Sequence, residues 1–355
     1  MFRSCNSTAW PPSSAPARPC PPSSTSSAST LPSGRPAVEL VDRLRQGDRR
    51  ALARILTLLE RQEPEARRLS AALHRLAGPA HTVGVTGPPG AGKSTLIARL
   101  VAALRQRPQT VAVVAIDPSS PLTGGALLGD RVRMTDLTGD PGVFVRSLAA
   151  RGGRGGLADV VGDFLTALAA AGFERILIET VGAGQDQVEV ADLVHTTLVV
   201  EPPGLGDEIQ ALKAGLLEVA DLFVVNKADR EGAAQTAAIL RQMLRLGPRR
   251  PWEPPVLLTT ATTGQGVEAV VAALDQHRAH LLRSGEWSRV EERRAASTIR
   301  RLAQRRLWRR LEAALPPDRW TTLVQAVAAR QTDPHHAADE LLRALGLPPE
   351  EPPPD

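Results

Sequence analysis

Between Thr82 and about Arg283, short runs of apolar and β-branched residues alternate with longer stretches of helical periodicity. Nearly continuous apolar strands separated by helices are typical of a parallel sheet that is covered on both faces. We therefore predict an α/β fold with a mostly parallel sheet and helices on both faces. The predicted strands lie at 82–86, 110–116, 143–146, 174–180, 196–200, 221–226 and 255–259.

The segments on either side of this region differ in composition. The first 36 residues contain 10 Ser and 8 Pro and no acidic residue, so we expect them to be disordered. Apolar positions then recur at helical spacing, and Asp48 is placed to cap a second helix. The sequence predicts a disordered tail at 1–36, an N-terminal helical region at 37–80, the α/β domain at 81–283, and a C-terminal helical arm and tail at 284–355.

The formal charge of +5 is unevenly distributed. Residues 275–310 carry a net charge of +7 and the N-terminal tail carries +3, so the rest of the chain carries −5. No apolar run approaches the roughly 18 residues that a membrane span requires. The only cysteines, Cys5 and Cys20, lie in the tail. The composition therefore argues against a membrane protein and a disulfide scaffold, and the absence of tyrosine makes base-stacking nucleic-acid modules unlikely.

The strongest chemical signal directly follows the first predicted strand. Residues 87–94 read GPPGAGKS, which satisfies the pattern GxxxxGK[ST]. In such a loop the backbone N–H groups surround nucleotide phosphates, Lys93 reaches the β and γ oxygens, and Ser94 binds Mg²⁺. We therefore predict a P-loop NTPase whose phosphate loop comprises Gly87, Pro88, Pro89, Gly90, Ala91, Gly92, Lys93, Ser94 and Thr95.

A second motif ends the sixth predicted strand, where residues 226–229 match the pattern NKxD. The Asp229 carboxylate can accept hydrogen bonds from guanine N1 and N2, which adenine does not offer. Asn226 would tie this segment to the phosphate loop, and the stem of Lys227 would lie over the base. The motif therefore indicates a guanine nucleotide.

A third segment follows the last predicted strand. It comprises Thr260, Ala261 and Thr262, followed by Gly264 and Gly266. It resembles the loop whose backbone N–H reads guanine O6 in GTPases, with Thr260 in place of the usual serine. The three segments together predict that the nucleotide is GTP or GDP rather than ATP.

Carboxylates suited to Mg²⁺ binding and hydrolysis lie between these segments. Asp117 ends the second predicted strand, Asp130 follows it, and Glu179 stands where many GTPases carry an aspartate. Because hard oxygen ligands at strand ends suit Mg²⁺, we expect a magnesium site made by these three carboxylates and Ser94. Gly182 would donate its N–H to the γ-phosphate. For any single carboxylate, a helix cap or a surface salt bridge is the alternative.

Together these segments resemble the MeaB/ArgK GTPases over about residues 37 to 308. The resemblance is carried by GVTGPPGAGKSTL, AIDPSSPLTGGALLGDRVRM, ETVGAGQDQ, PPGLGDEIQALKAGLLEVADLFVVNKAD and the helical GDRRALARILTLLE. It implies a GTP-hydrolysing chaperone of an adenosylcobalamin-dependent acyl-CoA mutase, first of all methylmalonyl-CoA mutase, which gates cofactor delivery and protects the mutase. It also implies slow intrinsic hydrolysis, stimulation by the partner, and a homodimer formed through the C-terminal arm.

The same resemblance implies roles for individual residues. A third switch at 204–213 would contain Asp207 and Lys213. Only three lysines stand beside 40 arginines in this chain, and a retained lysine indicates a position that requires a compact ammonium group. The residues implied in catalysis are Lys93, Glu179, Gly182 and Gln185, the last of them in the second switch.

Two other functions fit parts of the sequence. A metallochaperone GTPase for nickel or another metal shares the nucleotide motifs but should carry a Cys/His cluster. An Arg-rich nucleic-acid-binding protein would contact phosphates through the basic C-terminal stretch, although Leu302 and Leu307 among the arginines favour an amphipathic arm. We expect a cytoplasmic bacterial protein, or a mitochondrial matrix protein if residues 1–36 are a transit peptide.

Overall fold

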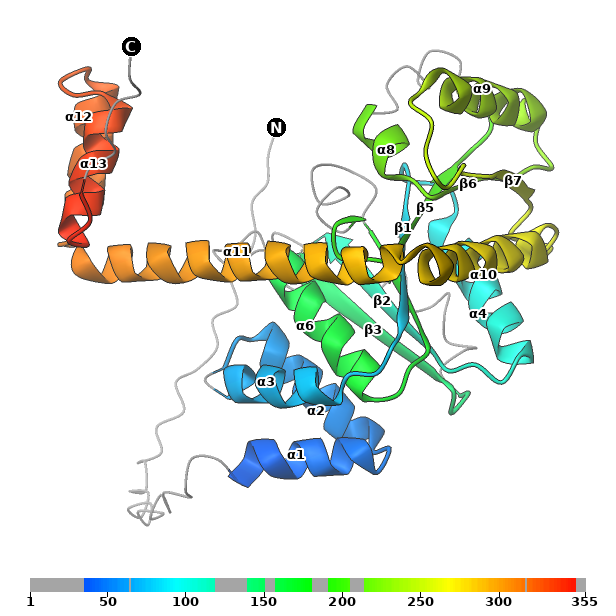
Figure 1. Cartoon of the computed structure of the whole chain (residues 1–355), viewed down its shortest axis with the longest axis horizontal. Helices are drawn as coiled ribbons and strands as arrows, with labels where there is room; N and C mark the ends of the chain where they lie inside the picture. The colour runs from blue at the N-terminus through cyan, green and yellow to red at the C-terminus, as the bar shows by residue number, and fades with distance from the viewer. Residues whose placement is uncertain are drawn as a thin grey trace, which may run out of the picture.

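The computed structural model describes residues 35–63, 65–118, 139–150, 157–180, 191–204, 214–316 and 318–348 (Figure 1). Its centre is a seven-stranded sheet with the strand order β3-β2-β4-β1-β5-β6-β7. Every neighbouring pair is parallel, so the predicted parallel sheet is confirmed. The strands are β1 His81–Thr86, β2 Val111–Pro118, β3 Val143–Ala150, β4 Arg175–Glu179, β5 Thr196–Glu201, β6 Leu222–Asn226 and β7 Val256–Thr259.

Helices cover both faces of this sheet. On one face α4 (Lys93–Gln106) and α10 (Val267–Ser284) bury apolar side chains against β1, β2 and β5. On the opposite face α6 (Leu157–Ala170) packs on β2 and β4, and α9 (Ala233–Leu246) packs on β6. A short helix, α8 (Ala214–Val219), precedes β6. This two-faced burial explains why the strands read as continuous apolar runs.

Three N-terminal helices form a further layer over α6. They are α1 (Arg35–Arg45), α2 (Arg49–Glu60) and α3 (Ala66–Leu76). The predicted cap of α2 is confirmed, because the Asp48 carboxylate accepts hydrogen bonds from the N–H groups of Arg50 and Ala51. Apolar residues of these helices and of α6 belong to one buried cluster, so the helical layer is continuous with the core of the sheet.

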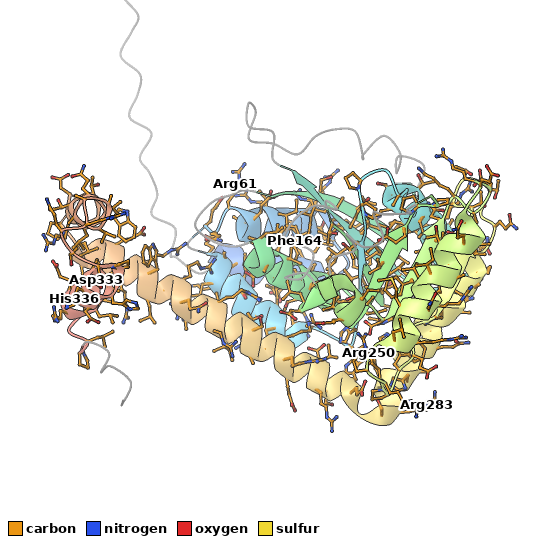
Figure 2. The ribbon with its side chains drawn as sticks, turned by 90° about the horizontal axis from the view of Figure 1, so that it is seen from above. Arg61, Phe164, Arg250, Arg283, Asp333 and His336 are labelled. Atoms are coloured by element: carbon orange, nitrogen blue, oxygen red, sulfur yellow. The ribbon has the colours of Figure 1, made fainter. Side chains whose placement is uncertain are left out.

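The C-terminal helices extend away from this body, as Figure 2 shows from above. The long helix α11 (Glu286–Ala314) leads to α12 (Arg319–Ala328) and α13 (Pro334–Ala344). Its first turns are held against the sheet by Trp287, whose ring stacks on that of His195 at a centroid distance of 3.8 Å. None of the described helices is both long and apolar enough to cross a bilayer.

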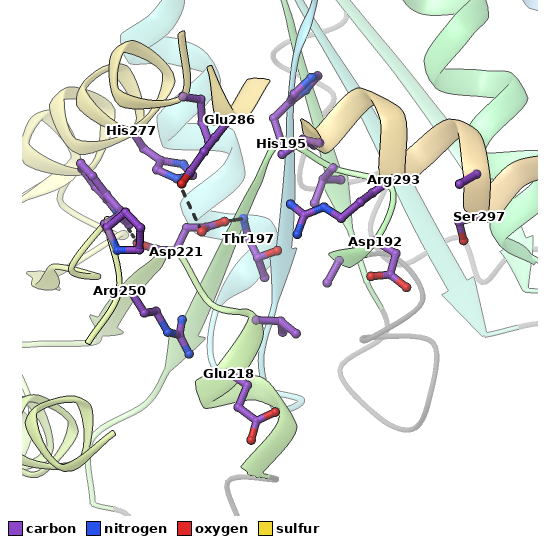
Figure 3. A pocket seen from close by; sticks show the side chains of 18 of the residues that line it. Asp192, His195, Thr197, Glu218, Asp221, Arg250, His277, Glu286, Arg293 and Ser297 are labelled. Carbon is purple, nitrogen blue, oxygen red and sulfur yellow. Dashed lines mark hydrogen bonds and ion pairs between the residues drawn. The ribbon is translucent and has the colours of Figure 1, made fainter. Parts of the chain in front are cut away.

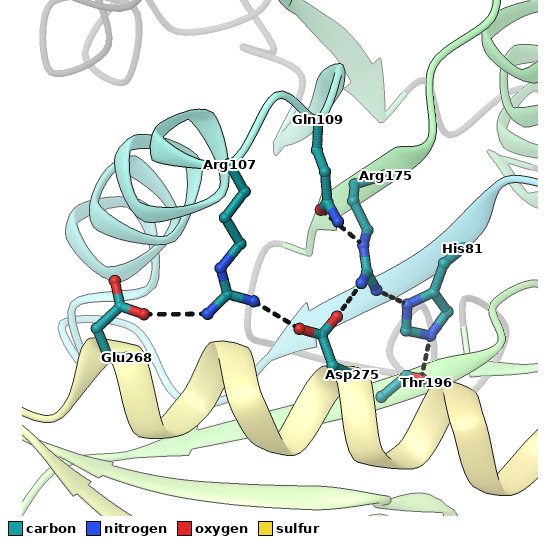
Figure 4. Close-up of polar contacts among 7 residues, drawn as sticks. All are labelled: His81, Arg107, Gln109, Arg175, Thr196, Glu268 and Asp275. Carbon is teal, nitrogen blue, oxygen red and sulfur yellow. Dashed lines mark hydrogen bonds and ion pairs between the residues drawn. The ribbon is translucent and has the colours of Figure 1, made fainter.

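A polar network ties α10 to the amino ends of the central strands (Figure 4). The buried guanidinium of Arg175 contacts both Asp275 of α10 and the ring of His81. His81 Nε2 lies 2.7 Å from the hydroxyl of Thr196, and burial holds the pKa of His81 well below its usual value. Because this network fills the space at the amino ends, and because open parallel sheets bind ligands at the carboxyl ends of their strands, we look for the site at the carboxyl edge.

Candidate active site

The segment between β1 and α4 is shaped by glycines at positions where a side chain would be both strained and crowded. Gly87 has a φ of +136°, and a Cβ atom there would lie 2.0 Å from the carbonyl oxygen of Val200. Gly92 has a φ of +90°, and its Cβ would lie 2.4 Å from Nδ2 of Asn226. The loop therefore runs directly against β5 and β6, and its backbone can approach a ligand closely.

Lys93 turns back over this loop from the first residue of α4. Its ammonium group donates to the carbonyl oxygens of Gly87 at 2.9 Å and Pro88 at 3.1 Å, and the side chain is 7% exposed. The first N–H groups of α4 point in the same direction, since a helix leaves them without partners inside the helix. The loop thus encloses a positive charge beside a helix N-terminus, which is the arrangement that binds phosphate.

Ser94 and Glu179 meet at the carboxyl edge of the sheet. The Ser94 hydroxyl donates to Oε1 of Glu179 at 2.6 Å, and both residues are buried. Glu179 reaches this position because β4 pairs with β1 in a register that places it opposite Val85. A hydroxyl and a carboxylate, both hard oxygen donors, therefore adjoin the phosphate loop, and this donor set fits Mg²⁺.

Asn226 connects three segments of the site. Its amide nitrogen donates to the carbonyl oxygen of Ala91 at 2.8 Å. Its amide oxygen accepts from the Thr259 hydroxyl and from the Ala261 N–H, each at 3.1 Å. One buried side chain thus joins the phosphate loop, the NKxD strand end and the loop after β7.

The rest of the NKxD segment turns outward from that junction. Lys227 has a φ of +60°, a conformation uncommon outside glycine, and the Ala228 N–H donates to the carbonyl oxygen of Thr259 at 2.9 Å. Asp229 is exposed, so its carboxylate is accessible to a ligand.

The loop after β7 is held by its own backbone. The Thr260 N–H donates to the carbonyl oxygen of Gln265 at 3.0 Å, and Thr260 in turn accepts from the N–H groups of Thr263 and Gly264. A Cβ atom at Gly266 would lie 2.2 Å from the carbonyl oxygen of Leu258, so the return of the chain requires glycine there. The three segments predicted for the nucleotide are therefore brought to one edge of the sheet.

Glu201 also lies at this edge, although the sequence did not mark it as a site residue. It ends β5 and is 2% exposed. Burial raises the pKa of Glu201 to about 7, and the charge of nearby Lys93 opposes that rise. An acid placed directly after the apolar run TTLVV was the signal that could have identified it.

The structure describes the remaining predicted residues only in part. Asp117 lies in β2 at the same edge, and only its backbone is described. Five others lie outside the described residues: Asp130, Gly182, Gln185, Asp207 and Lys213.

A cavity of about 560 Å³ lies at the other end of the strands, between β5, β6 and α11 (Figure 3). Its lining includes His277, Arg293 and Asp221, whose carboxylate accepts from the Thr197 N–H at 2.8 Å. Burial raises the pKa of Asp221 to about 7. Because Thr197 lies near the start of β5 and Glu201 ends it, this cavity is separate from the phosphate loop.

A wrapped glycine loop with a buried lysine, a serine–carboxylate pair and a linked NKxD strand end define a P-loop protein of the guanine-nucleotide type. Comparison with known proteins agrees. The family model of the methylmalonyl-CoA mutase-associated GTPase MeaB matches residues 52–315, more than half of the chain. The chain therefore belongs to the MeaB family and is a GTPase.

Individual relatives span most of the chain. A Pyrococcus abyssi protein named as a GTPase is 42% identical over 311 residues, which cover 86% of this chain and 96% of the relative. The mouse mitochondrial methylmalonic aciduria type A homolog is 35% identical over 260 residues, covering 68% of this chain and 63% of the relative. The crystal structure of an LAO/AO transport system kinase matches with a TM-score of 0.70 at 27% identity, covering 89% of this chain and all of that one.

Proposed function

We propose that this GTPase is the chaperone of an adenosylcobalamin-dependent acyl-CoA mutase, first of all methylmalonyl-CoA mutase. In this proposal GTP binding and hydrolysis gate cofactor delivery and protect the mutase. The observation that carries the nucleotide part is the Asn226 junction, which joins a phosphate loop to the segment that would read the base. Family membership and the mouse relative, named for methylmalonic aciduria, support the mutase part.

The phosphates would lie over residues 87–95, against the N-terminus of α4. Their oxygens would replace the carbonyl oxygens of Gly87 and Pro88 as partners of the Lys93 ammonium. Phosphoryl transfer depends mostly on positioning and electrostatic stabilisation, and Lys93 supplies the fixed positive charge. Gly182 N–H would hold the γ-phosphate, and Gln185 would orient the attacking water.

Ser94 and Glu179 would hold Mg²⁺, with Asp117 and Asp130 completing the site. When bound, the ion would neutralise the negative charge that develops on the phosphate oxygens during transfer. The Ser94 hydroxyl, which donates to Glu179 at 2.6 Å, would turn its lone pairs toward the ion, and the Glu179 carboxylate would hold that orientation.

The guanine base would lie between the NKxD segment and the loop after β7. The Asp229 carboxylate would accept from guanine N1 and N2, and the stem of Lys227 would cover the face of the base. The backbone of Thr260, Ala261 and Thr262 would face O6. Adenine offers neither the N1–H and N2 donors nor the O6 acceptor, so this site would select GTP and GDP.

The partner-dependent steps would involve the third switch, in which Lys213 pairs with an acidic switch residue such as Asp207 in only one nucleotide state. A switch can be biased only by a contact that differs between its states. We also propose a homodimer through the C-terminal arm, where Trp308 and Trp320 form an edge-to-face pair while remaining 42% and 47% exposed. A bacterial cytoplasmic or mitochondrial matrix location is part of the same proposal.

Affinity capture tests the mutase part. The full chain is immobilised and exposed to the purified mutase encoded in the same genome, with GDP or with a non-hydrolysable GTP analogue. We expect retention of the mutase that depends on which nucleotide is bound. The Lys93→Ala variant, which loses the ammonium group placed for the phosphates, is the control and should retain the mutase equally with either nucleotide. Equal retention by the wild-type chain with either nucleotide would contradict nucleotide-gated association.

A further inference from the structure

Arg99 lies on the exposed side of α4 and reaches across to the loop after β7. Its Nε donates to the carbonyl oxygen of Ala261 at 3.1 Å, and one terminal nitrogen donates to the carbonyl oxygen of Thr262 at 2.6 Å. The guanidinium group therefore holds two consecutive peptide units from one side. A planar fork suits this task, because its donors have a fixed relative geometry.

Holding a carbonyl oxygen also orients the N–H that shares its peptide plane. In a trans peptide the C=O of Ala261 and the N–H of Thr262 point in opposite directions. Since the Ala261 carbonyl points toward Arg99, the Thr262 N–H points away from α4.

The N–H groups on either side of Thr262 already have partners. The N–H of Ala261 donates to Asn226, that of Thr263 donates to Thr260, and that of Thr260 donates to Gln265. Among the described residues, the Thr262 N–H has no hydrogen-bond partner. Among the N–H groups of residues 260–264, that of Thr262 is therefore the donor left to a ligand, and Arg99 fixes its direction.

We propose that Arg99 is a positioning residue for guanine recognition, which aims the Thr262 N–H at O6 of the base. The proposal rests on the guanine site described above and adds to it a residue from the phosphate-loop helix. Arg99 touches neither the base nor the phosphates. Its exposure means that its removal takes no apolar side chain out of the core.

Two nucleotide analogues distinguish the recognition of O6 from the recognition of the N2 amine. In 6-thio-GDP sulfur replaces O6, whereas IDP keeps O6 and lacks the N2 amine that Asp229 would bind. Calorimetric titration of the full chain with GDP, 6-thio-GDP and IDP measures both preferences. In Arg99→Met we expect the preference for GDP over 6-thio-GDP to fall about fivefold, the size of one neutral hydrogen bond, while the preference for GDP over IDP is retained.

A matched control lies on the same helix. Arg105 pairs with Asp140 through its Nε at 2.8 Å, so Arg105→Met removes a comparable side chain without touching the loop, and both preferences should stay at the wild-type value. Arg99→Lys, with one donor group in place of the fork, should give an intermediate 6-thio-GDP preference. The proposal is overturned if both preferences are unchanged in Arg99→Met, or if both fall together. If the wild-type chain bound GDP and ADP equally well, the proposed guanine site itself would be contradicted, and not only the role of Arg99.

Discussion

The amide nitrogen of Asn226 lies 2.8 Å from the carbonyl oxygen of Ala91 and donates to it across 135 residues of sequence. The same side chain accepts from the loop after β7 through its oxygen. A carboxamide donates through its nitrogen and accepts through its oxygen from a single planar unit. The phosphate loop and the loop after β7 are therefore positioned by one residue.

Removing that amide should weaken nucleotide binding as a whole. In Asn226→Ala the Ala91 carbonyl and the Ala261 N–H lose their partners in a buried site, at a cost of about 1–3 kcal/mol for each unsatisfied group. We expect the dissociation constants of GTP and GDP to rise at least about tenfold, as measured by calorimetric titration. Thr263→Ala is the control, because it removes two hydroxyl bonds within the same loop, one to the Thr260 carbonyl oxygen and one from the Gln265 N–H, and leaves the Asn226 contacts in place. Wild-type affinity in Asn226→Ala would show that the junction does not organise the site.

Asp229 should determine which base is bound. Because Asp229 is exposed, Asp229→Asn changes the base-reading group without disturbing the core. The amide offers a donor where the carboxylate offered only acceptors, so affinity should fall for GTP and rise for XTP. Titration of the wild type and of Asp229→Asn with GTP, XTP and ATP measures this change in preference. A uniform loss for all three nucleotides would contradict base reading by Asp229.

A methyl group at Gly92 should act through Asn226. The Cβ atom would lie 2.4 Å from Nδ2 of Asn226, and the φ of +90° is strained for any other residue. Gly92→Ala should therefore lose at least about tenfold in GDP affinity while the sheet still folds. Gly78→Ala is the matched control, since φ there is ordinary and no atom lies within 4 Å of the added Cβ. Circular dichroism confirms folding, and fluorescence titration with a labelled GDP reports the affinity.

Much of this arrangement could be predicted from the sequence because its causes are local. Apolar runs between helices marked all seven strands, and glycines around Lys93 marked the loop that wraps it. Glu201 and Arg99 were not predicted as site residues, because their positions near the site depend on strand order and helix packing. The sequence predicted a single C-terminal helical arm and tail at 284–355, and the division of this region into α11, α12 and α13 was not predicted.

The buried histidines make stability depend on pH. Burial lowers the pKa of His277 from 6.5 to about 4, so between these values the unfolded chain binds a proton that the native chain does not. The stability from neutral His277 is therefore complete above pH 6.5 and is lost as the pH falls toward 4. Nearby Asp221, whose pKa is raised, contributes in the opposite direction, so the comparison must be made between variants.

His277→Asn removes the titrating ring and offers an amide toward Thr196, whose hydroxyl lies 2.8 Å from His277 Nδ1. When the pH is lowered from 7.5 to 5, the free energy of unfolding should fall by about 2 kcal/mol more in the wild type than in the variant. Urea denaturation at both pH values measures this change, with His335→Asn at an exposed position as the control. An identical pH dependence in wild type and His277→Asn would contradict a neutral buried ring.

If this GTPase serves a mutase, the mutase should change the rate of GTP hydrolysis, and that rate is measured with and without the partner. Positioning and electrostatic stabilisation supply most of the catalysis of phosphoryl transfer. The hydrolysis rate of a slow GTPase should therefore rise when a partner fixes its switch segments. Phosphate release is followed at saturating GTP and Mg²⁺ while the purified mutase encoded in the same genome is titrated to saturation. We expect a saturable increase in the rate of hydrolysis that is absent in Lys93→Ala. An unchanged rate at saturating mutase, with binding verified independently, would contradict it.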